Sequence, residues 1–259
     1  MELPTITNKQ QEILSLIKRF RFLNRIQIQS LLNHKDYRRI NQWLKDLNQK
    51  EYLNRIYSTD FNEKSKPAIY YATINAIRIY KSLGDDSSQL KKLYSDNERS
   101  QNFIDEQIFL ADLCLDLLSK NSDSEIHYEF ATAADVTSNS PYHFMGELSP
   151  QLIFTKKTKE EFRQYILVLL DTSSPKYMTK KKLRNYIEFF FTNEWEENTK
   201  KTFPTILFAC QTKELMISAK RTMKRLLNDY QDPEDLEIWF ATHEDIREHG
   251  ISAEIWEWN

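Results

Sequence analysis

The sequence predicts an α/β protein, α+β overall, that is divided into two domains. Three observations lead to this fold class: helical apolar periodicity with short connections near the start, a break rich in small and acidic residues at 84–88, and apolar strands alternating with amphipathic helices after it. A chain of 259 residues is long enough for two cores. We therefore expect a first domain over residues 1–83, a linker over 84–96 and a second domain over 97–259.

Three short helices are predicted in the first domain. Thr7 opens the first helix, and Gln10 three residues later completes a capping box. Asn24 and Gln27 repeat the device before the second helix. A third helix is expected over 36–50, with apolar side chains on one face that we place in the core: Ile40, Trp43, Leu44 and Leu47.

A β-hairpin is predicted after the third helix. Strand-like runs over 52–59 and 67–73 flank a polar, charged turn at 60–66. A further helix over 74–83 closes the domain. Three short helices followed by a hairpin are typical of a winged helix-turn-helix.

Charge is distributed unevenly along the chain. Residues 1–83 contain 15 Lys and Arg against 7 Asp and Glu, whereas the rest contains 21 against 31. This asymmetry indicates a polyanion-binding module joined to an acidic body. A chance excess of solvated lysines is the alternative.

The outward face of the third helix carries side chains suited to double-stranded DNA. Arginine, asparagine and glutamine hydrogen-bond guanine and adenine edges in the major groove, and lysine suits phosphate contact. The hairpin tip adds lysines that would meet the DNA backbone or the minor groove. The alternative is a solvated helix face in a protein-binding winged helix. The predicted DNA-binding residues are Arg38, Arg39, Asn41, Gln42, Lys45, Lys64 and Lys66.

The second domain is predicted to be a mixed sheet with helices on both sides. A helix over 97–118 is apolar nearly all round, which suits a core helix or a subunit interface. The unbroken apolar run 165–170 indicates a central strand buried on both faces. Strands are expected over 125–130, 148–154, 164–171, 204–210 and 236–241, an edge strand over 253–258, and helices over 180–191 and 213–230.

This order of elements resembles the core of the restriction-endonuclease-like nucleases. The whole chain resembles the replication-relaxation family, most specifically in "QQEILSLIKRFRFLNRIQIQSLL", "RRINQWLKDLNQKEYLNRIY" and "KPAIYY", and more loosely in "LSPQLIF", "YILVLLD", "KKLRNYIEFF" and "FPTILFACQTKEL". The resemblance implies a DNA-binding protein of a plasmid or other mobile element. It also implies a role in replication, supercoil relaxation or mobilisation, and transcriptional control is a further option.

The nuclease-like domain is expected to be catalytically degenerate. A nuclease of this architecture places an acid on its second strand and acid-x-Lys on its third, because clustered carboxylates bind the metal. This chain has Gln151 at the first position and Leu169-Leu170-Asp171 at the second. Asp171 alone would hold Mg²⁺ poorly. We expect no catalytic residue, metal ligand or cofactor, and a metal-dependent nuclease or nickase that uses Glu147 as a substitute acid is the alternative.

Several other classes of protein are excluded by composition. Three widely separated glycines cannot build a phosphate-binding loop. Cys114 and Cys210 suggest buried free thiols in a reducing compartment. Without a signal peptide or a membrane span, the protein is expected to be cytoplasmic and to have no membrane partner. Double-stranded DNA is the expected partner, and a homodimer or replication and mobilisation proteins are left open.

One basic stripe lies in the acidic half of the chain. On the helix predicted over 213–230, the face opposite the apolar residues presents Lys213, Lys220, Arg221 and Lys224. This stripe is either a second phosphate-binding track or a solvated helix face.

Overall fold

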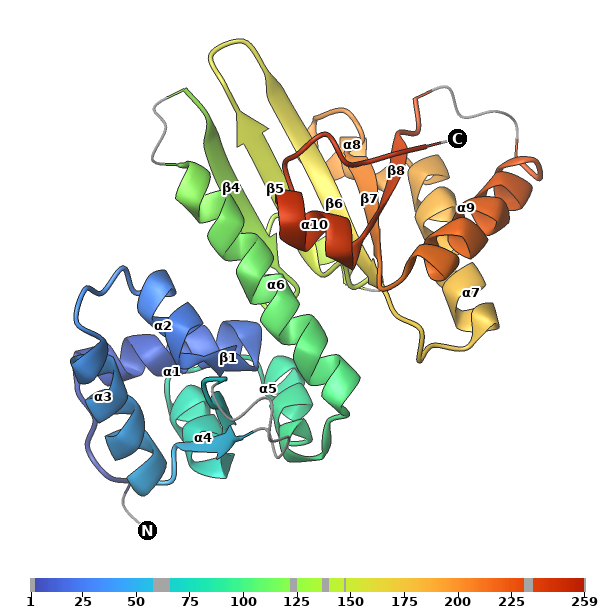
Figure 1. Cartoon of the computed structure of the whole chain (residues 1–259). Helices are drawn as coiled ribbons and strands as arrows, with labels where there is room; N and C mark the ends of the chain where they lie inside the picture. Colours follow the sequence, from blue (N-terminus) through green and yellow to red (C-terminus); the bar gives the residue numbers. More distant parts are fainter. Residues whose placement is uncertain are drawn as a thin grey trace. The chain divides into compact units, whose positions relative to one another are not determined.

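A computed structural model describes residues 3–57, 66–121, 125–136, 140–146, 148–230 and 235–258. The chain divides into two compact units, Met1–Leu115 and Asp116–Asn259 (Figure 1). Each unit has its own sheet and its own core, and each is described separately below.

The first unit is a winged helix. Its three helices are α1 (Asn8–Phe20), α2 (Arg25–Leu31) and α3 (Tyr37–Gln49). A small antiparallel sheet has the order β1-β3-β2, with bounds Leu23–Asn24, Ile69–Ala72 and Leu53–Ile56. Strands β2 and β3 form the wing, and α4 (Ile74–Ser82) follows them.

The predicted helix starts are confirmed. Thr7 and Gln10 form both hydrogen bonds of a capping box at α1, and Asn24 and Gln27 do the same at α2. Asp36 caps α3 by accepting a hydrogen bond from the backbone N–H of Arg38. These caps satisfy backbone groups that would otherwise lack partners at each helix start.

The core of the first unit contains the predicted apolar face of α3, with one exception. Ile40, Leu44 and Leu47 are completely buried. Trp43 is only half-buried and packs edge-on against His34, with ring centroids 5.2 Å apart. The expectation that Trp43 lies in the core is therefore wrong, because it occupies the margin of the apolar stripe.

The segment predicted as a linker, residues 84–96, is folded within the first unit. It contains α5 (Ser87–Leu93), in which Leu90 and Leu93 are buried, and it leads into a 3-10 turn, η2 (Asp96–Glu98). The Asp96 carboxylate is completely buried and forms an ion pair with Arg21. The division between the units instead falls within α6 (Gln101–Lys120).

The second unit is built on a five-stranded mixed sheet with the order β4-β5-β6-β7-β8. The strands are antiparallel from β4 to β6 and parallel from β6 to β8. Their bounds are β4 His127–Thr132, β5 Leu152–Lys157, β6 Phe162–Leu170, β7 Thr205–Cys210 and β8 Ile238–Thr242. The central strand predicted over 164–171 is β6, and its last five residues are buried, as expected for a strand covered on both faces.

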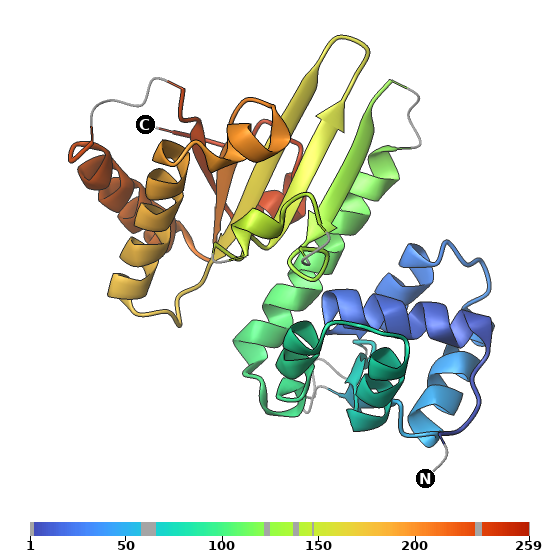
Figure 2. The same cartoon turned by 180° about the vertical axis from the view of Figure 1, so that it is seen from behind.

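Helices cover both faces of this sheet (Figure 2). Helices α7 (Lys176–Phe191) and α9 (Lys213–Leu227) pack on one face, where they share a core with Ile166, Val168 and Phe208. The short helix α10 (His243–His249) lies on the opposite face (Figures 1 and 2). The mixed α+β class and its two sheets are as predicted.

Three details of the second unit differ from the prediction. Helix α8 (Glu194–Thr199), helix α10 and the 3-10 turn η3 (His143–Met145) were not anticipated. The expected edge strand over 253–258 is reduced to one antiparallel bridge between Glu257 and Phe240. Among the residues that the structure describes, no helix is long and apolar enough to cross a membrane.

Candidate nucleic-acid interface

Helix α3 has one buried face and one exposed polar face. Because its apolar residues recur at helical spacing, burying them turns the remaining positions outward. The predicted DNA-binding residues of this helix are all exposed: Arg38, Arg39, Asn41, Gln42 and Lys45. Within the described ranges, Arg38, Arg39 and Lys45 form no ion pair with another residue. Their charges are therefore available to a ligand.

The acidic residue of α3 that could weaken this surface is held by other groups. Asp46 accepts hydrogen bonds from Gln10 of α1 at 2.6 Å and from Lys50 at 2.7 Å. The hydrogen bond from Lys50 lowers the pKa of Asp46 most, and the hydrogen bond from Gln10 adds to this effect, so the pKa lies below its usual value. Gln10 is itself almost completely buried, so this contact also attaches α3 to α1.

Two residues that sequence reasoning did not select extend the surface beyond α3. Tyr37, the first residue of α3, is 51% exposed. The guanidinium groups of Arg25 and Arg38 each lie 5.9 Å from the centroid of its ring. The start of α2 therefore presents Arg25 next to the start of α3. The signal in the sequence is an arginine directly after the cap Asn24.

The wing contributes a second arginine that was not selected. Arg55 of β2 is exposed, lies 5.1 Å from the centroid of the Tyr57 ring and pairs across the sheet with Tyr70. Burial raises the pKa of Tyr70, as does Tyr57, while Arg55 and Arg25 act in the opposite direction. Arg25 and Arg55 therefore both lie near Tyr70, which links α2 to the wing.

Of the two lysines predicted at the wing, the structure describes one. Lys66 is exposed at the start of the segment that leads into β3. Lys64 lies outside the described residues, within 58–65. The cations of α2, α3 and β2 form one polar and positively charged surface with the exposed rings of Tyr37 and Tyr57. We call it the α3–wing surface, and its cations are Arg25, Arg38, Arg39, Lys45 and Arg55. Such a surface can contact phosphates and base edges together.

In the second unit, Gln151 and Leu169, which occupy the positions where a nuclease has acidic residues, lie next to each other. Gln151 precedes β5, and its Oε1 accepts a hydrogen bond from the backbone N–H of Leu169 on β6 at 3.0 Å. The amide thus completes the strand pairing, and Leu169 is buried. Neither side chain supplies a carboxylate at this point.

Asp171 follows β6 and stabilises the turn into α7. It accepts hydrogen bonds from the backbone N–H and the hydroxyl of Ser174, both at 2.8 Å, and from the Ser173 hydroxyl. Burial opposes ionisation, but the hydrogen bonds from both serines outweigh it, so the pKa of Asp171 lies below its usual value. Within the described ranges, no group of three or more His, Cys, Asp and Glu side chains could hold a metal ion. The substitute acid Glu147 lies outside those ranges.

Two further polar groups lie near Asp171 at the carboxyl ends of the parallel strands. Lys182 of α7 donates a hydrogen bond to the Leu169 carbonyl at 2.9 Å. His243, which follows β8, is buried, and burial followed by the nearby Arg247 lowers its pKa to about 4. A hydrogen bond to the Ala209 backbone and the charge of Asp171 only partly oppose that shift. At neutral pH the imidazole is therefore uncharged.

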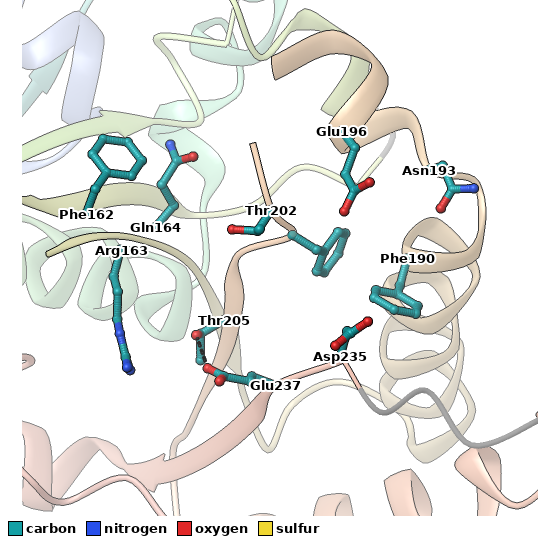
Figure 3. A pocket seen from close by; sticks show the side chains of 11 residues that line it. Phe162, Arg163, Gln164, Phe190, Asn193, Glu196, Thr202, Thr205, Asp235 and Glu237 are labelled. Carbon is teal, nitrogen blue, oxygen red and sulfur yellow. Dashed lines mark hydrogen bonds between the residues drawn. The ribbon is translucent and has the colours of Figure 1, made fainter. Parts of the chain in front are cut away.

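A pocket of about 680 Å³ opens at the opposite ends of these strands (Figure 3). Among the described residues that line it, the acidic ones are Glu196, Asp235 and Glu237, and the last accepts a hydrogen bond from Thr205 at 2.7 Å. Arg163 is the basic residue among these described lining residues. Three carboxylates against one guanidinium disfavour a phosphate, so this pocket does not suit DNA.

Comparisons with known proteins agree with the family resemblance. The family profile described as replication-relaxation matches residues 14–206. Among solved structures, a mutant of MarR from E. coli has 18% identity and a TM-score of 0.27, covering 42% of this chain and 78% of that chain. The same protein complexed with operator DNA has 18% identity, a TM-score of 0.26 and coverages of 39% and 74%.

A mutant of ZitR from Lactococcus lactis has 16% identity and a TM-score of 0.28, covering 48% of this chain and 80% of that chain. A search of curated protein sequences finds no match. The family profile spans well over half of the 259 residues, including the winged helix and the sheet as far as the start of β7. The chain belongs to the replication-relaxation family.

Proposed function

We propose that this protein binds double-stranded DNA sequence-specifically through its winged helix. The observation that carries the proposal is the exposed face of α3, on which Arg38, Arg39 and Lys45 have no ion-pair partner among the described residues. In this arrangement α3 enters the major groove, which is wide enough to admit a helix.

The residues divide into two roles. Arg38, Asn41 and Gln42 read base edges, because their side chains can form two hydrogen bonds with one base. Arg39 and Lys45 contact phosphates and set the register of the helix. Outside α3, the positioning role extends to the arginines of α2 and β2 and to the wing lysines: Arg25, Arg55, Lys64 and Lys66.

The second domain is proposed to be non-catalytic and to serve assembly or partner binding. This proposal is supported by the chemistry of Gln151 and Leu169, since an amide and an aliphatic group provide neither charge for a metal nor a base for water. Membership of the replication-relaxation family supports a role in replication, relaxation or mobilisation of a plasmid or other mobile element, or in its transcriptional control.

The test begins by selecting bound sequences from a random duplex library. The affinities for the selected duplex and for a scrambled duplex are then measured by fluorescence anisotropy. We expect Arg38→Ala and Gln42→Ala each to lose about 1–3 kcal/mol on the selected duplex and little on the scrambled one. Lys45→Ala should weaken both duplexes to a similar extent.

Arg78→Ala is the matched control, because Arg78 is exposed on α4 and hydrogen-bonds only Asn75 among its described neighbours. It should leave both affinities unchanged. Equal losses for Arg38→Ala, Lys45→Ala and Arg78→Ala on both duplexes would contradict the proposal, because the effect would then follow net charge and not position.

A metal-dependent nuclease is the second candidate. The observation in its favour is that Asp171 and His243 follow the carboxyl ends of the parallel strands β6 and β8, where Lys182 of α7 donates a hydrogen bond to the Leu169 carbonyl. Ligands of open α/β sheets commonly bind at this edge. Incubation with supercoiled plasmid and Mg²⁺ or Mn²⁺ separates the two candidates, since only a nuclease nicks or linearises the plasmid.

A further inference from the structure

Basic residues of the second unit are concentrated on two helices. Residues 116–259 contain 18 Lys and Arg and 24 Asp and Glu. Helices α7 and α9 hold ten of these basic residues but only two of the acidic ones, Glu188 and Glu214. The rest of the unit therefore has a strongly negative net charge, whereas the net charge of these two helices is positive.

The fold brings the two helices together on one layer. Helices α7 and α9 pack side by side on the same face of the sheet (Figures 1 and 2). Because they connect the parallel strands β6, β7 and β8, both run opposite to the strands and therefore parallel to each other. Their N-termini, which carry partial positive charge, lie at the same edge of the sheet.

Most of these cations face solvent. Lys220 forms an ion pair with Glu257 at 3.1 Å, and Lys182 donates a hydrogen bond to the Leu169 carbonyl. The other eight are exposed, and within the described ranges none of them forms an ion pair. They are Lys176, Lys180, Lys181, Arg184, Lys213, Arg221, Lys224 and Arg225.

We propose that α7 and α9 form a second DNA-binding surface, which contacts the phosphate backbone without reading sequence. Placing eight like charges close together is unfavourable unless a polyanion neutralises them. The 16 residues of α7 extend about 24 Å at 1.5 Å per residue, which matches about seven phosphates along one DNA strand. Asn185, the one asparagine or glutamine of α7 and α9, is half-buried, whereas Asn41 and Gln42 of α3 are exposed. The surface of α7 and α9 therefore adds affinity and not specificity.

This inference rests on the proposed binding of DNA, and the test separates the two surfaces. The full chain is compared with the triple variant Lys181→Gln, Arg184→Gln, Lys224→Gln. The matched control, Lys159→Gln, Lys200→Gln, Lys201→Gln, removes the same charge from exposed positions of the same unit outside α7 and α9. Anisotropy on a random-sequence duplex is recorded between 50 and 200 mM salt. Far-UV circular dichroism confirms that each variant is folded.

We expect the log–log salt slope of the α7–α9 variant to be less negative by about 2–3, because each lost phosphate contact changes it by about 0.9. The loss of affinity between 50 and 200 mM salt, a fourfold change in concentration, then shrinks by about 16- to 64-fold. The control should keep the slope of the natural protein.

An unchanged slope in the α7–α9 variant, or an equal change in the control, overturns the inference. Arg38→Ala, Arg39→Ala is measured in parallel to test the α3–wing surface. If only this double variant changes the slope, DNA binding by the winged helix stands and the second surface does not. If only the α7–α9 variant changes it, the second surface stands and the proposed role of α3 fails.

Discussion

Replacing Leu44 by alanine tests whether α3 is held as the structure shows. Leu44 is completely buried, and α3 packs against α1, α2 and β2. Truncation of a fully buried leucine leaves a cavity that costs about 2–5 kcal/mol. Since a domain is typically stable by about 5–15 kcal/mol, this loss is a large share of the stability of the winged helix.

Amide hydrogen exchange measured by mass spectrometry resolves this effect for each unit. A loss of 2–5 kcal/mol corresponds to exchange that is faster by about 30- to 4,000-fold, since 1.4 kcal/mol is a factor of ten. We expect this acceleration in peptides of α1 and α3. Peptides from β6 and β7 serve as the internal control, because they belong to the core of the second unit and should exchange as before.

Trp43→Ala is the comparison that makes this prediction specific. Trp43 is half-buried against His34, so its removal should cost about 1–2 kcal/mol from partial burial and one aromatic contact. Exchange in α3 should therefore accelerate less than in Leu44→Ala. Unchanged protection in Leu44→Ala, or a larger effect of Trp43→Ala, would refute the described orientation of α3.

Other predictions concern binding, catalysis and pH. About four to six phosphate contacts by the winged helix alone imply a log–log salt slope of roughly −4 to −5, and an affinity that does not change with salt would contradict DNA binding. The protein should not cleave supercoiled plasmid with any divalent metal, and Asp171→Ala should only reduce stability to urea by about 1–2 kcal/mol through lost turn hydrogen bonds. Metal-dependent cleavage that disappears in Asp171→Ala would favour the nuclease. Because the pKa of His243 is lowered to about 4 in the folded state, protonation favours unfolding, and about 3 kcal/mol of stability should be lost as pH falls from about 6.5 to 4. His243→Gln should remove this pH dependence in urea titrations, and an unchanged dependence would show that other groups cause it.

Local sequence was sufficient to predict much of the fold. The capping boxes at Thr7 and Asn24 and the periodic apolar residues of α3 act within four positions of the chain, so their effect can be recognised without tertiary contacts. The buried strand β6 was recognisable for a similar reason, because an unbroken apolar run excludes an exposed strand. Helix α8 was missed because six residues are too few to show periodicity, whereas α10 carried a usable signal in the cap that Thr242 and Asp245 form.

The sequence by itself determined the two-domain α+β class, the winged helix and the polar face of α3. Only the tertiary structure decided which distant residues share a surface or a core. Asp96 became part of the first unit because its buried carboxylate pairs with Arg21, 75 positions earlier, and no local pattern encodes that contact. Arg25 and Arg55 joined the α3 surface through Tyr37 and the wing. Likewise, α7 and α9 combine their charges because parallel strands return both helices to one face of the sheet, and that topology follows from long-range strand pairing.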